Sequence, residues 1–127
     1  MANPALSQIV DGGSLRVNHD DRFERLAMAV ADVRAGVRLS PRTAKLIAAG
    51  PARMAKKVME EAAEVAIEAV RGQRQAVIHE SVDLLYNLVV LWSACGVEPG
   101  EVWAEMDRRE NRFGMVEKLP KSVAEDI

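Results

Sequence analysis

Two short acidic segments carry the residues of this sequence that are best suited to chemistry. They are residues 60–64 (Glu-Glu-Ala-Ala-Glu) and residues 80–83 (Glu-Ser-Val-Asp). Each contains two carboxylates three residues apart, and on a helix that turns by about 100° per residue these point only about 60° apart. Each segment therefore predicts a pair of carboxylates on one helix face.

Both pairs interrupt faces that should turn toward a core. Glu61 is in line with Met54, Val58 and Val65, whereas Glu80 shares its side with Val77, Leu84 and Leu91. Removing a lone carboxylate from water is costly, and Lys57, one turn before Glu61, offsets one charge at most. A divalent cation would neutralise such a group, and all-oxygen ligation favours Mg²⁺ or Mn²⁺ over Zn²⁺. We therefore predict a metal site formed by Glu61, Glu64, Glu80 and Asp83.

Other assignments stay open for the acidic residues. A single pair at this spacing is typical of a solvated helix face, and only the combination of two pairs on adjacent helices favours a metal site. Glu60 and Glu68 lie near the same face, where each would serve as a ligand, a partner of a ligand or a solvated group. His79 points about 100° away from Glu80, so it is not expected to bind the metal.

Five helices are expected to position these residues. Their apolar spacing, their Pro and Ser starts and their Gly stops predict helices over residues 22–34, 41–49, 51–71, 75–95 and 99–112. The segment 82–92 is apolar on nearly every side, so its helix is expected at the centre of a bundle. No stretch alternates with a period of two, and the predicted fold class is an all-α bundle of about five helices.

The bulk properties limit the function. A chain of 127 residues is one domain, for which we expect a flexible N-terminal arm over residues 1–20 and a folded domain over residues 21–127. The net charge of −2 argues against nucleic acids and membranes as partners. Cys95 is the only cysteine, so no disulfide forms within the chain, and this favours a reducing cytoplasm. We also expect Cys95 to be buried. Trp92 and Trp103 add large apolar groups, and on this basis we expect an oligomer.

The acidic pattern resembles the signature of the all-α nucleoside triphosphate pyrophosphohydrolases, the MazG-like proteins. Three segments are similar to the phosphoribosyl-ATP pyrophosphatase family of histidine biosynthesis: residues 43–50 (Thr-Ala-Lys-Leu-Ile through Gly), residues 56–61 (Lys-Lys-Val-Met-Glu-Glu) and residues 80–86 (Glu-Ser-Val-Asp-Leu-Leu-Tyr). The likeness extends to Arg108-Arg109 and Glu117-Lys118, and it covers roughly residues 22–120.

The resemblance implies an activity and roles for residues. It implies Mg²⁺ on Glu61, Glu64, Glu80 and Asp83, release of pyrophosphate from phosphoribosyl-ATP, and a homodimer whose sites form where subunits meet. A carboxylate left free of the metal would act as general base, and both Glu60 and Glu64 are candidates. The residues expected to bind the substrate are Lys57, Asn87, Arg108, Arg109, Arg112 and Lys118, although the four on the last helix and tail are equally consistent with solvated charge.

Three positions depart from the family pattern. The family has His after the Tyr, Tyr before the Thr, and Gly before the Glu-Glu pair, whereas this chain has Asn87, Arg42 and Met59. Asn donates and accepts hydrogen bonds but cannot exchange a proton as His does. Two alternatives therefore remain: a house-cleaning pyrophosphohydrolase that acts on another nucleotide, and a helical binding module without activity.

Overall fold

A computed structural model describes residues 21–113, which form five α-helices and no strand. The helices are α2 (Asp21–Arg34), α3 (Pro41–Ala49), α4 (Pro51–Val70), α5 (Arg74–Cys95) and α6 (Pro99–Phe113). The all-α prediction is confirmed, and every helix boundary lies within one residue of the expected position. The arm expected over residues 1–20 and the tail from Gly114 fall outside the described residues.

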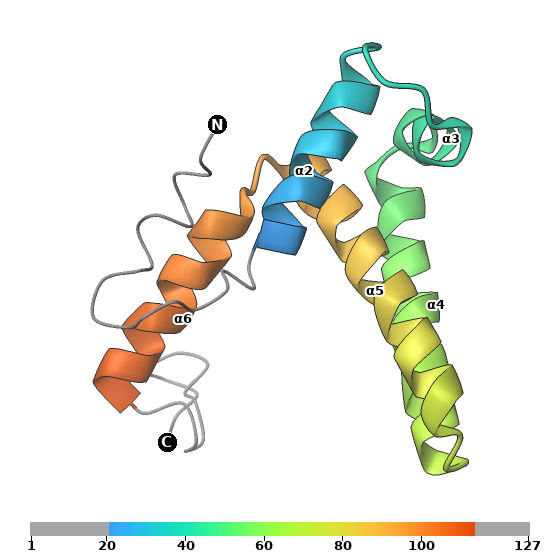
Figure 1. Ribbon diagram of the computed structural model, residues 1–127, viewed down its shortest axis with the longest axis vertical. Coiled ribbons are helices and arrows are strands. Elements are labelled where there is room, and N and C mark those ends of the chain that lie inside the picture. The colour runs from blue at the N-terminus through green and yellow to red at the C-terminus, as the bar shows by residue number, and fades with distance from the viewer. Residues whose placement is uncertain (1–20, 114–127) are drawn as a thin grey trace, which may run out of the picture.

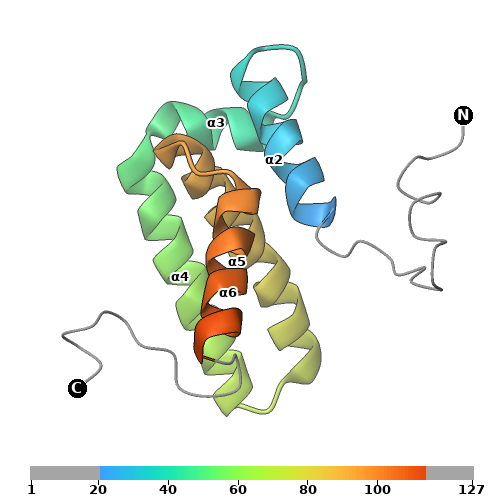
Figure 2. The same cartoon turned by 90° about the vertical axis from the view of Figure 1, so that its left-hand side faces the viewer.

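The two long helices α4 and α5 lie side by side as an antiparallel hairpin (Figures 1 and 2). The turn between them includes Gly72, whose φ of 72° lies in the left-handed region that favours glycine. The Gly72 N–H donates to the carbonyl of Ala69 (3.1 Å) and satisfies one of the last carbonyls of α4. Because this turn is tight, the acidic segments of the two helices face each other across the hairpin.

The core lies at one end of this hairpin. Val30 from α2, Met54 from α4 and Val90 from α5 are each at most 1% exposed and pack together, with α3 closing over them. The other end of the hairpin extends beyond α2 and α3 (Figure 1). The expectation that residues 82–92 are central is thus confirmed for Val90 but wrong for Val82, which is 61% exposed, because no helix within residues 21–113 covers that end.

The two tryptophans pack against each other and against Phe23 of the same chain. Trp92 of α5 and Trp103 of α6 pack edge to face with centroids 6.3 Å apart, and Phe23 of α2 contacts both rings. The Trp103 indole N–H also donates to Glu24 (3.2 Å). Trp92 and Trp103 therefore stabilise the junction of three helices and give no support for an oligomer.

After this junction α6 diverges from the α4–α5 hairpin (Figure 1). Cys95, at the end of α5, was expected to be buried but is exposed, because α6 turns away after Gly96. Within residues 21–113 no single helix is long and apolar enough to cross a membrane, and only α5 with α6, bent by 102°, reach that length and composition together.

Candidate metal and phosphate site

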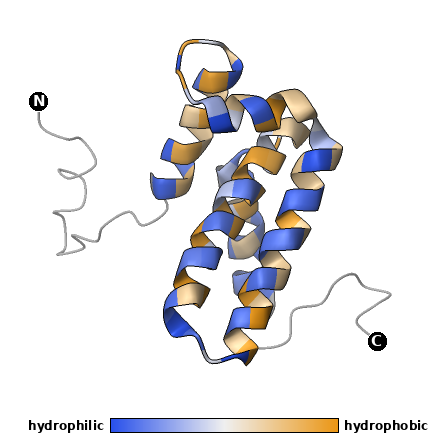
Figure 3. Ribbon diagram, turned by 90° about the vertical axis from the view of Figure 1, so that its right-hand side faces the viewer, coloured by the Kyte–Doolittle hydropathy of each residue, from blue (hydrophilic) through white to orange (hydrophobic). Residues whose placement is uncertain are grey.

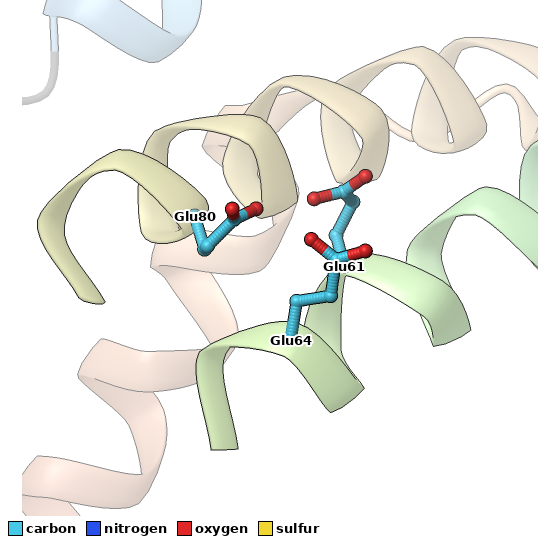
Figure 4. Close-up of side chains that lie close together, drawn as sticks. All are labelled: Glu61, Glu64 and Glu80. Atoms are coloured by element: carbon cyan, nitrogen blue, oxygen red, sulfur yellow. The ribbon is translucent and has the colours of Figure 1, made fainter. Parts of the chain in front are cut away.

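Three of the four predicted ligands meet between α4 and α5. Carboxylate oxygens of Glu61, Glu64 and Glu80 all lie within 4.8 Å of one another. Glu61 and Glu64 project from successive turns of α4, and Glu80 projects toward them from α5 (Figure 4). The spacing of three residues on one helix and the tight turn to the next are what bring these side chains together.

Glu61 is the most buried member of this acidic group. Its residue is 9% exposed, one carboxylate oxygen (Oε2) lies 3.8 Å from the Lys57 ammonium, and the other (Oε1) is buried without a hydrogen-bond partner. An unsatisfied buried carboxylate oxygen is costly, and a bound cation would satisfy it. Three carboxylates with one orphaned oxygen form an all-oxygen donor set that fits a hard divalent ion.

Glu80 shows the electrostatic consequence of this crowding. The neighbouring Glu64 carboxyl is the main cause that raises the pKa of Glu80 from 4.5 to about 7, and burial and the nearby Glu61 carboxyl add to it. In the metal-free protein Glu80 therefore remains partly protonated near neutral pH. A cation that binds here must displace that proton.

The other acidic candidates lie around this group. Asp83, one turn further along α5, is not among the three clustered carboxylates, and its backbone carbonyl accepts a hydrogen bond from the Asn87 amide (2.8 Å). Glu60 is outside the group too, on the exposed side, with an oxygen 3.7 Å from the Lys57 ammonium. Glu68 pairs instead with Arg71 (3.8 Å) near the end of α4.

Two of the expected substrate-binding residues meet in a cavity next to the acidic group. Lys57 and Asn87 line a space of about 260 Å³ together with three further cations and two apolar residues: Arg42, Lys45, Arg53, Leu46 and Ala49. The sequence identified Arg42 only as a departure from the family pattern, and it did not indicate Lys45 or Arg53 as substrate-binding candidates. The four-residue step from Arg53 to Lys57 was the available signal, because it places both cations on one helix face.

The arginines of α6 lie apart from this site within one chain. Arg108 and Arg109 both bind Glu105 on their own helix, at 2.7 Å and 2.8 Å. These ion pairs lower the pKa of Glu105 to about 2. Since α6 packs against α2 and diverges from α4, the structure does not bring Arg108, Arg109 or Arg112 to the acidic group. Lys118 falls outside the described residues.

An all-α fold with acidic residues clustered across a helical hairpin defines a class of candidate metal-binding hydrolases, and comparison with known proteins gives the family. The family model of phosphoribosyl-ATP pyrophosphohydrolase matches residues 32–110. A protein of Rhodopseudomonas palustris named phosphoribosyl-ATP pyrophosphatase 2 is 57% identical over 102 residues, which cover 80% of this chain and 78% of that protein. This chain belongs to the phosphoribosyl-ATP pyrophosphohydrolase family.

Further relatives carry the same name. A phosphoribosyl-ATP pyrophosphatase 2 of Bradyrhizobium diazoefficiens is 55% identical over 103 residues, covering 81% of this chain and 77% of that protein. A phosphoribosyl-ATP pyrophosphatase of Azospirillum brasilense is 53% identical over 76 residues, covering 60% of this chain and 68% of that protein. No solved structure matches the chain significantly.

Proposed function

We propose that this protein hydrolyses phosphoribosyl-ATP to phosphoribosyl-AMP and pyrophosphate, a step of histidine biosynthesis. The observation that carries the proposal is the acidic group of Glu61, Glu64 and Glu80, with its orphaned Glu61 oxygen, in a chain of this family. The lone cysteine supports a reducing cytoplasm as its location.

The proposed metal is Mg²⁺, with Mn²⁺ as a substitute, held by Glu61, Glu64 and Glu80 and by Asp83 from the next turn of α5. When bound, such an ion neutralises charge on the phosphates and on the leaving pyrophosphate. Carboxylate oxygens alone are the donor set that favours these two metals.

The surrounding residues supply the remaining chemistry. Since Glu64 lies inside the acidic group, Glu60 is the better placed of the two candidate bases to accept the proton of the attacking water. Lys57 lies near both Glu60 and Glu61, at 3.7 Å and 3.8 Å, where its ammonium can contact a phosphate at the metal. Asn87 contributes a hydrogen bond in place of the family's His.

We also propose that the working form is a homodimer joined through the exposed end of the α4–α5 hairpin. Ile78, Val82 and Leu85 repeat at four and three residues along one face of α5, and they are 42%, 61% and 40% exposed. Ile67 and Val70 of α4 are exposed as well, and apolar positions alternate with polar ones over both helices (Figure 3). The apolar face of a helix normally packs against other helices, away from water. Here a second copy of the chain would bury it.

A house-cleaning enzyme that acts on another nucleotide is the second candidate, and the replacement of the family's His by Asn87 favours it. An assay of pyrophosphate release should compare phosphoribosyl-ATP with ATP, dCTP and dUTP in the presence of Mg²⁺. We expect phosphoribosyl-ATP to be preferred. Glu61→Gln should abolish the activity, whereas Glu110→Gln, at an exposed position of α6, should not. Preference for an ordinary nucleotide would overturn the assignment.

A further inference from the structure

The cavity beside the acidic group has the features of a second binding site. It is formed by α3, α4 and Asn87 of α5, and Arg53, one of its lining residues, precedes Glu61 by eight residues on α4. At a rise of 1.5 Å per residue, Arg53 and Glu61 are about 12 Å apart along the helix axis. The cavity is therefore close to the metal site but distinct from it.

Four cations surround this cavity, and none of the described residues that line it is a carboxylate. Among these four, Lys57 lies within ion-pair distance of Glu60 and Glu61. Arg42, Lys45 and Arg53 form no ion pair with any residue between 21 and 113. Such unneutralised like charges repel one another and favour an anionic ligand, of which phosphate is the one that Arg and Lys bind best.

Arg42 is held in position by its neighbours. Its guanidinium lies 4.6 Å from the centroid of the Tyr86 ring, a distance typical of a cation–π contact. The Tyr86 hydroxyl is in turn hydrogen-bonded to the buried Thr43, with oxygens 2.6 Å apart. Because the supporting ring is itself fixed, the Arg42 side chain is ordered at the edge of the cavity before any ligand binds.

Asn87 adds a requirement for a hydrogen-bond donor on the ligand. The residue is 1% exposed, and its amide donates to the Asp83 carbonyl (2.8 Å), which fixes the orientation of the side chain. Its carbonyl oxygen is buried without a partner and needs a donor. Near neutral pH inorganic phosphate carries few P–O–H donors, and they belong to the same small anion that the cations bind, so one group would have to serve the cations and this oxygen at once. A sugar phosphate carries both an anionic group and hydroxyl donors.

We propose that this cavity binds the phosphoribosyl group of the substrate: Arg42, Lys45 and Arg53 hold its 5-phosphate, and the Asn87 carbonyl accepts a hydrogen bond from a ribose hydroxyl. The inference rests on the proposed function and names the residues that select phosphoribosyl-ATP over ATP. In that substrate, adenosine separates the triphosphate from the added phosphoribosyl group, which agrees with a separate cavity beyond the acidic group.

Two of the three family departures are explained together by this arrangement. Arg42 and Asn87 replace a Tyr and a His, and the structure places both replacements at one cavity. A guanidinium is always charged, whereas a His is charged only below its pKa near neutral pH. Arg42 thus supplies a permanent positive charge at a site where Asn87 supplies only a hydrogen bond.

Binding to the metal-free protein tests the cavity directly. Calorimetry in the presence of a chelator should show that ribose 5-phosphate binds more tightly than inorganic phosphate or pyrophosphate. Arg42→Ala should weaken ribose 5-phosphate about tenfold, the effect of losing one charge-assisted hydrogen bond. Arg38→Ala, an exposed cation outside the cavity, is the matched control and should change nothing. Asn87→Leu should abolish the preference for ribose 5-phosphate over phosphate. If Asn87→Leu does not fold, the result with Arg42→Ala still tests the cavity.

Kinetics separate the failure of this inference from the failure of the proposed function. Arg42→Ala should raise the KM for phosphoribosyl-ATP about tenfold and leave the KM for ATP unchanged, because ATP lacks the phosphoribosyl group. Equal changes in KM for both substrates, or tighter binding of pyrophosphate than of ribose 5-phosphate, would overturn the assignment of the cavity. Neither result would contradict the proposed hydrolysis of phosphoribosyl-ATP. If phosphoribosyl-ATP is not hydrolysed while ribose 5-phosphate still binds, the proposed substrate is wrong and the sugar phosphate site stands.

Discussion

Carboxylate oxygens of Glu64 and Glu80 lie within 4.8 Å of each other across the α4–α5 hairpin, and this neighbour is the main cause that raises the pKa of Glu80 to about 7. The ionised carboxylates of Glu64 and Glu80 would repel each other, so the proton that Glu80 retains stabilises the metal-free fold. The same proton competes with a metal ion. Stability and metal affinity are therefore both coupled to pH through this pair.

The first prediction concerns the pH dependence of the metal-free protein. The folded-state pKa of Glu80, about 7, lies above the ordinary value of 4.5, so the folded chain binds more protons than the unfolded chain between these values. This contribution to stability is complete below about pH 4.5 and is lost as the pH rises through 7. The melting temperature in a chelator should fall between pH 5 and pH 8, and Glu80→Gln should flatten that fall.

A second prediction concerns metal binding. Mg²⁺ or Mn²⁺ that binds only the folded state should stabilise it by about 2.7 kcal/mol at a free concentration one hundred times Kd. The rise in melting temperature should be larger at pH 8 than at pH 6, because the Glu80 proton no longer competes. Glu64→Gln should reduce the rise, whereas Glu110→Gln should preserve it. A melting temperature that does not respond to millimolar Mg²⁺ would argue against the metal site.

Oligomerisation gives the third prediction. Val82→Glu would place a charge in the apolar face that we assign to the dimer, and it should convert the protein to a monomer with little activity. Leu39→Glu is the matched control, because Leu39 is 91% exposed in the loop between α2 and α3, away from that face. Light scattering on both variants distinguishes the outcomes. A wild-type monomer at micromolar concentration would contradict the proposed interface.

The sequence predicted the helices and three of the four carboxylates expected to converge, because both depend on local spacing. Glu61 and Glu64 share a helix face wherever that helix packs, and the Gly72 turn brings Glu80 opposite to them. The cavity was not foreseen, since it depends on how α3 packs against α4, which places Arg42 next to Asn87 although they are 45 residues apart. The packing of the tryptophans could not be predicted for a similar reason: periodicity places Trp92 and Trp103 on apolar helix faces but does not show which surface they contact, and the oligomer expected from them stays a prediction.

Complementation tests where the α6 arginines act. Within one chain Arg109 is bound to Glu105 on a helix that diverges from the acidic group, so we expect Arg109 to reach the site of the partner copy. Glu61→Gln and Arg109→Ala should each lower activity strongly when alone. In a mixed dimer of these two variants, one site would combine the intact Glu61 of one chain with the intact Arg109 of the other. Unfolding and refolding the two variants together should then restore roughly a quarter of wild-type activity, since half of the dimers are mixed and each has one intact site. If Arg109 acted within its own chain, every site would carry one defect and mixing would restore nothing.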